Sequence, residues 1–579
     1  MGSMDFISAQ DLDLKWSEKI IYDNQKDGFF QEFINSNSKY IYAMFTNYTF
    51  SGVKKAKKIK IISFDKDNMK KSADVSLVGY KENLASKDQY KGLVYYRTIV
   101  FEDLLYVFWR KETKEKEELF VQSFDGKLKS LNPLKKIYEI SNTGHSRRER
   151  SSQFIYVLAN KKAGEKIVIG TEKPTENLDV KFEYKVLNKD LTFSDANQIA
   201  LPIKLISKSY GLTSSYEYGD DGNLYIRSSV SMSKEERKNA KKGESTSYSV
   251  LSILDLKSGN INPFVMKFEN KNIFDFDFQI DKSTVKIYGF FCDLLKDPHG
   301  TDLHGIFYCV IDGKNFTMKS QKFSYFDKST LDKLFAKDKE DQKKSKGLFK
   351  SKKDEKSDEE SLDNTFEIED VQSIDQDNIV LFCTKMYNYS VTTCTSNGKG
   401  GTTCYTNYYC RKSNVTVFKL NNEGGIVWAS NLDRQITYSN WNIYDLNVIN
   451  KNGKFYVIYG SDFQTGVEKK GFFSSKSRKQ QRDRFEYAVF DYASGAYKKN
   501  EFVVNAVNEK KDIKTVDPRL ISVIDNKFYV NSDRIRLKPG ITAAYCVGAI
   551  VCLPVLYFLQ LDGNARYGTG NLGVITPLK

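Results

Sequence analysis

The sequence predicts an all-β protein that folds as a single closed β-propeller. Three observations support this: the composition, a repeat of sixty to seventy residues, and a constant order of strands and turns within each repeat. The chain has 579 residues, with 36 Tyr, 39 Phe and only nine Pro. Aromatic residues favour strands, and 28% charged with 40% hydrophobic residues is a globular composition.

The repeat is an apolar strand that ends in Asp or Asn and is followed by a turn. It reads "IKIISFDKDN" at 59–68, "VLSILDLKSGN" at 250–260 and "FEYAVFDYASG" at 485–495. The turn residues are Asp65, Asp125, Asn188, Asp255, Asp312, Asn421, Asp491 and Asp562. Their separations are 57 to 71 residues, apart from one step of 109. The regular spacing indicates eight related units.

The long step contains an insertion at about 336–363. Residues 336–360 carry nine Lys and eight acidic residues with almost no apolar ones. Such a segment cannot bury a core, so we expect it to be disordered. Just before it, "DKSTLDKLF" has the pattern of a helix start behind Asp327 and Ser329.

Each unit has the same internal order. An apolar first strand, such as "IEDVQSI" at 368–374, leads through a tight turn to a Tyr-rich second strand, such as "KFYVIYGS" at 454–461. The Asp-ended third strand follows, and a fourth strand carries Trp in "IVWASNL" at 426–432. Four strands per unit predict propeller blades, eight by first choice and seven as the alternative.

The ring is expected to close through the N-terminal strand. Residues 12–20, "LDLKWSEKI", have the form of a fourth strand, and they complete the last blade beside the C-terminal strands. Closure would leave no free sheet edge. The third strand of that blade is expected at 556–564, and the tail 566–579 competes for the closing position. Residues 1–11 are interpreted as a tag or disordered N-terminus, and 12–579 as the propeller.

These motifs resemble bacterial propellers of the YVTN and PQQ-repeat type. The matching residues are Asp221-Gly222-Asn223-Leu224-Tyr225-Ile226 and the segment from Val417 to Trp428. The resemblance covers nearly the whole chain and is greatest to uncharacterised exported or envelope-associated members. It implies no quinone cofactor and no calcium ion, since no ligand-binding residue can be carried over.

The connections between the second and third strands are long and largely basic. Equivalent connections project from one face of a propeller, and loops on a rigid scaffold are where binding is usually found. The alternative is solvated charge that keeps the hairpins soluble. The candidate interaction residues are Lys54, Lys55, Lys238, Lys241, Arg478, Lys479 and Arg482, with Ile550 and Val551 as an apolar anchor. Net charge is +15, which favours an acidic partner.

Cysteines suggest the compartment. Cys394 and Cys404 flank a Gly-rich hairpin loop, and Cys546 and Cys552 lie in an apolar one, so at least one disulfide is predicted. An oxidised pair would place the protein outside the cytoplasm, whereas reduced buried thiols are the alternative. Residues 541–561 are uncharged, long enough to span a bilayer but interrupted by Pro554. The other interpretations are a hydrophobic loop, which would contact a partner or the membrane surface through residues 541–554, and a buried pair of strands.

No enzyme motif follows a strand in the required context, and we assign no catalytic residue, cofactor or metal. His299 and His304 with Asp302 form only a loop cluster, and Asp220-Asp221 lie in a turn. The predicted function is a non-enzymatic protein-protein interaction scaffold of the bacterial cell envelope, exported to the periplasm or outer membrane. It is expected to bind an envelope protein, such as a component of an outer-membrane or secretion assembly, and not nucleic acid. The alternative is a propeller hydrolase or lyase acting on an acidic glycan or other anion at the central channel.

Overall fold

The computed structural model describes the strands and most of the turns between them. The described residues are 11–23, 29–46, 59–77, 93–101, 103–141, 155–159, 166–175, 177, 179–194, 197–204, 214–231, 238, 247–281, 284–297, 302–313, 315–328, 330–331, 362–363, 366–375, 378–396, 402–438, 445–461, 467–469, 475–477, 484–504, 516–537 and 566–578. The chain divides into two compact units. Unit 1 comprises residues 1–141, 444–492 and 497–579, and unit 2 comprises 142–443 and 493–496.

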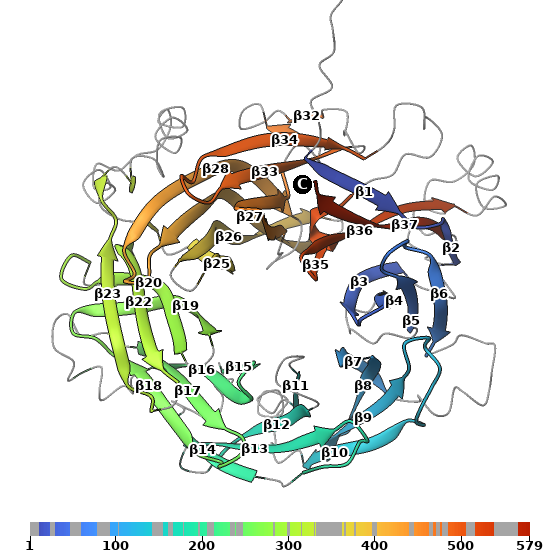
Figure 1. Ribbon diagram of the computed structural model, residues 1–579, viewed down its shortest axis with the longest axis horizontal. Helices are drawn as coiled ribbons and strands as arrows, with labels where there is room; N and C mark the ends of the chain where they lie inside the picture. Colours follow the sequence, from blue (N-terminus) through green and yellow to red (C-terminus); the bar gives the residue numbers. More distant parts are fainter. Residues whose placement is uncertain are drawn as a thin grey trace, which may run out of the picture. The chain divides into compact units, whose positions relative to one another are not determined.

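Unit 1 holds four antiparallel sheets (Figure 1). One contains β3 (Phe29–Ser36), β4 (Tyr40–Thr46), β5 (Ile59–Asp65) and β6 (Lys71–Ser76); the next contains β7 (Val94–Phe101), β8 (Leu104–Glu112), β9 (Lys116–Phe124) and β10 (Lys135–Ser141). A third contains β29 (Leu446–Lys451), β30 (Lys454–Tyr459), β33 (Arg484–Asp491) and β34 (Tyr497–Val503). The last contains β35 (Ser522–Ile524), β36 (Lys527–Leu537), β37 (Arg566–Pro577) and β1 (Leu12–Trp16), with β2 (Ile20–Asp23) also on β37.

Unit 2 also holds four antiparallel sheets. They contain β11 (Ile155–Ala159), β12 (Lys166–Pro174), β13 (Asp179–Asn188) and β14 (Asn197–Lys204); β15 (Ser215–Tyr218), β16 (Asn223–Ser231), β17 (Ser247–Asp255) and β18 (Ile261–Met266). The others contain β19 (Lys271–Asp281), β20 (Thr284–Asp293), β22 (Gly305–Asp312) and β23 (Met318–Tyr325); and β25 (Phe366–Ser373), β26 (Ile379–Ser396), β27 (Thr402–Leu420) and β28 (Ile426–Tyr438).

Small elements accompany the sheets. Two-strand pairs join β21 (Asp302–Leu303) to β24 (Leu362–Asp363), and β31 (Val467–Lys469) to β32 (Ser475–Ser477), and a 3-10 helix covers Pro518–Leu520. At the expected helix start, Asp327 Oδ1 accepts from Thr330 N at 2.6 Å, and the residues after Leu331 lie outside the described part. No helix among the described residues is long and apolar enough to span a membrane, and residues 541–561 lie outside that part.

The core lies between successive sheets. In unit 2, Tyr288 and Phe290 of β20 pack with Leu381 of β26 and Phe418 of β27. In unit 1, Tyr42 of β4 belongs to one apolar cluster with residues of the neighbouring β7–β10 sheet. The second strands are therefore buried on both faces, and β4 is buried along all seven residues. This explains why the second strands read as continuous apolar runs rather than as alternating ones.

The repeated turns form as the sequence predicts. Asp65 Oδ1 accepts from Asp67 N at 3.0 Å, Asp255 Oδ1 from Lys257 N at 2.8 Å, and Asn421 Oδ1 from Glu423 N at 3.1 Å. The side chain thus closes a turn two residues on, which is the reason Asp and Asn recur there. Between β29 and β30, Asn452 and Gly453 have φ of 53° and 72°, as a type I′ hairpin turn requires.

The prediction that the N-terminal strand completes the last sheet is confirmed. Residues 12–16 pair antiparallel with β37, from Leu12 opposite Pro577 to Trp16 opposite Gly573. The predicted third strand of that sheet is wrong, because β37 rather than 556–564 pairs with β36. Ten consecutive residues, Arg566 to Ile575, extend along β36, and their backbone pairing fixes this register.

Two residues at the end of the predicted charged insertion form a short strand. Leu362 and Asp363 pair with Leu303 and Asp302. The backbone groups of β21 supply the ladder that orders these two residues. The rest of the insertion, 336–361, lies outside the described residues, as do residues 1–10 and Asp562.

Candidate functional site

Carboxylates line the first strands of three successive sheets in unit 2. They belong to β15, β19 and β25, which lie on the concave side of the row of sheets in that unit (Figure 1). Glu217 comes from β15, Asp275 and Asp277 from β19, and Glu367 and Asp370 from β25. A first strand packs its apolar residues against its own sheet, and acidic residues take the alternate positions. The result is one acidic surface built from three sheets.

A β-bulge at an equivalent position shapes two of these strands. The register shifts between Phe274 and Phe276 on β19, and between Ile368 and Asp370 on β25. The extra residues are therefore Asp275 and Glu369. A bulge re-aims a side chain out of the normal alternation, and bulges are frequent next to binding sites.

Hydrogen bonds hold the carboxylates in place. Asp275 Oδ2 accepts from the backbone N–H of Ile368 at 2.9 Å, which ties β19 to β25. Asp277 Oδ1 accepts from its neighbour Phe278 N at 2.9 Å and from Arg227 Nη1 at 3.2 Å. The same guanidinium nitrogen donates to Phe276 O at 2.8 Å. Arg227, on β16, is thus fixed between two sheets beside the acidic strand.

The environment disfavours the charged form of these carboxyls. Desolvation raises the pKa of Asp275, Asp277, Glu217, Glu367 and Asp370. Arg227 lowers the pKa of Asp277 in opposition, but desolvation is the larger effect there. Several desolvated carboxyls on one concave surface are typical of a functional site, because they favour any group that brings a positive charge.

A pocket of about 490 Å³ opens at the turn end of the same three strands. Among the described residues, four acids line it, Glu217, Asp220, Asp281 and Asp375, together with one cation, Lys286. Across the pocket wall, Ser373 Oγ donates to Gln279 Oε1 at 2.5 Å, which fixes β25 against β19. Four carboxylates around one lysine give the pocket a negative charge in a chain whose net charge is +15.

A buried ion cluster lies at the other end of the β25–β28 sheet. Lys412 Nζ is 2.7 Å from Glu369 Oε1, and Arg434 Nη2 is 3.7 Å from the same oxygen. Side-chain exposure is 0% for Lys412, 0% for Arg434 and 4% for Glu369, and Arg434 Nη2 also donates to Thr384 Oγ1 at 3.1 Å. The bulged glutamate therefore neutralises cations that come from two outer strands.

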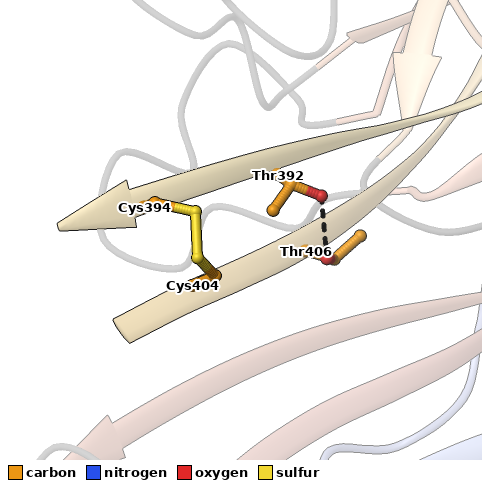
Figure 2. The surroundings of a disulfide bond; sticks show 4 residues. All are labelled: Thr392, Cys394, Cys404 and Thr406. Carbon is orange, nitrogen blue, oxygen red and sulfur yellow. Dashed lines mark hydrogen bonds between the residues drawn. A yellow bond between two sulfur atoms is a disulfide. The ribbon is translucent and has the colours of Figure 1, made fainter. Parts of the chain in front are cut away.

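The predicted disulfide is confirmed for one pair. Cys394 on β26 and Cys404 on β27 lie directly opposite each other and are bonded (Figure 2). Cys546 and Cys552 lie outside the described residues. Cys292, Cys309, Cys383 and Cys410 are buried.

The predicted interaction residues are largely untested by the structure. Lys238 is exposed. The other members of the set lie outside the described residues: Lys54, Lys55, Lys241, Arg478, Lys479, Arg482, Ile550 and Val551. Whether this set lies on one face therefore stays a prediction.

The histidine loop is built for packing. His304 is buried, and its Nδ1 accepts from Asp293 N at 3.2 Å. Burial lowers the pKa of His304. His299 lies outside the described residues, and within the described part of the chain no three Cys, His, Asp or Glu residues are grouped to hold a metal ion. Asp221 serves its turn as predicted, since its Oδ1 accepts from Asn223 N at 3.1 Å.

The sequence interpretation missed the acidic first strands. A signal was present, because "FDFDF" at 274–278 and "FEIED" at 366–370 alternate aromatic or aliphatic residues with acids. That alternation shows a strand with one buried face, and the other face carries the carboxylates.

Comparisons with known proteins identify no family for this chain. No family model and no curated protein matches it. Among solved structures, the polysaccharide lyase Uly1 is 11% identical, with 97% of this chain and 100% of that chain covered and a TM-score of 0.33. The WD40 domain of SCAP from fission yeast and the Dos1 propeller are each 8% identical, cover 89% of this chain and 92% of theirs, and have TM-scores of 0.32 and 0.35. These scores are too low to support an argument, so the description of the sheets rests on this chain alone.

Proposed function

We propose that the chain is a non-enzymatic interaction scaffold that binds a cationic group of a protein partner on the acidic first strands of unit 2. The observation that carries the proposal is the pocket of about 490 Å³ lined by Glu217, Asp220, Asp281 and Asp375. Desolvation raises the pKa of Glu217 in the pocket lining, and a lysine or arginine side chain bound there would stabilise its charged form.

The wider proposal keeps the architecture and compartment that the sequence suggests. The eight sheets would close into one propeller, and the protein would be exported to the periplasm or outer membrane and bind an envelope protein there. The Cys394–Cys404 disulfide supports an oxidising compartment. The basic loops with Lys54, Arg478 and Ile550 would form a second contact for an acidic partner.

Calorimetry with an arginine-rich peptide tests the acidic surface. We expect the parent protein to bind the peptide and to ignore a glutamate-rich peptide of equal length. The variant Glu217→Gln, Asp281→Asn, Asp375→Asn should weaken binding at least tenfold, since three charges leave the pocket. The control Asp67→Asn, Glu112→Gln, Glu115→Gln removes three exposed acids of unit 1, so its net charge equals that of the pocket variant. Equal loss of binding in both variants would reduce the effect to net charge and refute the site.

Binding should also depend on pH in a stated direction. A bound cation pulls the pKa of the nearby carboxyls down, so binding releases protons. Because desolvation raises the pKa of Asp277 and Glu217, these groups become neutral at a higher pH than exposed acids do. Affinity should therefore be full at neutral pH and fall as the pH drops through the raised values.

One observation favours the second candidate, a hydrolase or lyase. A carboxyl with a raised pKa, such as that of Asp277, has the protonation behaviour of a general acid. The acidic surface opposes the anionic substrate that the sequence interpretation suggested. Incubation with acidic and neutral glycans, with detection of new chain ends, tests this; activity that disappears in Asp277→Asn would favour the enzyme over the scaffold.

A further inference from the structure

The hairpin of β26 and β27 extends beyond its own sheet as a two-stranded ribbon. β25 pairs with β26 only as far as Lys385, and β28 pairs with β27 only from Cys410. The remaining residues of β26 and β27 pair with each other alone, up to Ser396 opposite Thr402. Within the described part of the chain, no further strand pairs with Ser390–Ser396 or Thr402–Asn407, so both edges of the ribbon are open.

This ribbon lacks the features that protect open edges. Between Met386 and Ser396, and between Thr402 and Tyr409, it has no charged residue and no Pro, although 28% of the chain is charged. It is rich in Thr and Tyr, and the side chain of Tyr405 is 63% exposed. Proteins usually guard such edges with Lys, Pro or bulges, and an uncharged segment of high β-propensity is a template for another strand.

The geometry of the cystine pair shows which amides face outward. The Cα atoms of Cys394 and Cys404 are 4.0 Å apart. In an antiparallel ladder the closer pairs are those that do not exchange hydrogen bonds with each other. The N–H and C=O groups of Cys404 therefore point away from β26, and so do those of Thr406, two residues on. On the opposite edge, the same holds for Cys394 and Thr392.

Two contacts stiffen the ribbon in this conformation. The disulfide joins the strands near the tip, and Thr392 Oγ1 and Thr406 Oγ1 are 2.9 Å apart on the same face (Figure 2). A strand that is already extended loses less conformational entropy when it pairs. The open edge is thus held ready for a partner.

We propose that the β27 edge of this ribbon, Thr402–Asn407, pairs antiparallel with the same edge of a second copy of this chain. Two identical uncharged edges meet without like-charge repulsion, and antiparallel pairing places Thr beside Tyr across the two-fold axis. The net charge of +15 opposes broad contact between copies, so the contact stays on the uncharged element that projects from the sheet. We place the contact on the β27 edge rather than the β26 edge because the exposed Tyr405 lies on β27, where it can pack against an added strand.

Sedimentation velocity of the full chain, from dilute to concentrated solution, tests this dimer. We expect a reversible monomer–dimer equilibrium and concentration-dependent protection of the Cys404 and Thr406 amides from hydrogen exchange. Thr406→Pro removes one outward N–H, and it should weaken the dimer by about tenfold or more. Thr406→Val keeps that N–H while removing the hydroxyl, so it should dimerise like the parent.

The matched control lies on the opposite edge. Thr392→Pro removes an outward N–H from β26 and should leave the dimer intact, because that edge is not used. Circular dichroism and thermal melting confirm that each variant is folded. A monomer at every concentration overturns the proposal, and so does a dimer that Thr406→Pro leaves unchanged or that Thr392→Pro abolishes.

Discussion

Two hairpins at equivalent positions, β8–β9 and β26–β27, place their charges at opposite ends. In the β7–β10 sheet the charges lie at the exposed end, where Lys116 and Lys136 contact Glu139 at 3.0 and 2.9 Å. In the β25–β28 sheet they lie at the buried base, where Glu369 meets Lys412, and the ribbon beyond is uncharged. Exposed pairs add little stability but guard an edge, whereas a buried pair costs much when broken. Hairpins at equivalent positions thus differ: charged side chains protect the edges at β8–β9, whereas the β26–β27 ribbon has no such protection.

The largest loss of stability should come from removing the buried carboxylate of Glu369. Glu369→Ala leaves Lys412 and Arg434 buried without their carboxylate, and it should lower the free energy of unfolding by about 3–5 kcal/mol. Chemical denaturation measures the change. Glu369→Gln keeps the side-chain shape without the charge, so its free energy of unfolding should lie between those of the parent and Glu369→Ala. A loss below about 1 kcal/mol for Glu369→Ala would mean that water reaches the cations.

The disulfide should have a smaller and local effect. Cys394→Ser with Cys404→Ser opens a closure of sequence separation 10 and should cost the ribbon about 2–3 kcal/mol of local stability. Hydrogen exchange should rise at Val391 and Asn407 while β25 and the base of β26 keep their protection. Reduction of the parent protein should reproduce this pattern. Faster exchange throughout the β25–β28 sheet would instead show that the disulfide supports the sheet itself.

The exposed ion pairs of Lys116 and Lys136 with Glu139 should show their effect in the pH dependence of stability. Hydrogen bonds from Lys136 and Lys116 lower the pKa of Glu139 to about 2. The contribution of Glu139 to folding stability is therefore present above the ordinary glutamate pKa and is lost as the pH falls toward about 2. Carbon-13 NMR titration of labelled glutamate checks the value. Lys116→Gln with Lys136→Gln should return the pKa of Glu139 to its usual range. An unchanged titration would show that these two lysines do not lower this pKa.

The smallest change in stability is expected when the open ribbon is given charges like those of β8–β9. Val391 and Asn407 are opposite each other and exposed. Val391→Glu with Asn407→Lys should alter the free energy of unfolding by less than about 0.5 kcal/mol, because surface changes of this kind are nearly neutral. The same variant should prevent dimer formation in sedimentation experiments. Dimerisation at parental strength would show that missing charge is not what leaves the edge open.

The strand order could be predicted from sequence because its signals are local. Asp65 and Asn421 close turns through their own side chains, and Asn452-Gly453 supplies the positive φ of a hairpin turn, so neither needs distant contacts. Trp16 marked a fourth strand, and β1 takes that place. These features depend on a few neighbouring residues only.

The alternation of acidic and apolar residues on two first strands could be read from the sequence, but the rest of the site depends on contacts that are not local. Lys412 reads as one more surface lysine until β25 places Glu369 beside it. The bulge at Asp275 depends on the register between β19 and β20, which sequence alone does not fix. The raised pKa of Asp277 arises from burial that only neighbouring sheets create. The basic loops were conspicuous in sequence, and the acidic strands were hidden within apolar patterns.

The pairing of β1 with β37 has a consequence for biosynthesis. Leu12 and its partner Pro577 are 565 residues apart in the chain. At about 5–20 residues per second, the first strand waits roughly 30–110 s for its place in the sheet. During that interval, the apolar face of Leu12 and the unpaired backbone of β1 are exposed to wrong partners. This sheet is therefore completed late, and until then chaperones and other chains can bind the unpaired β1 strand.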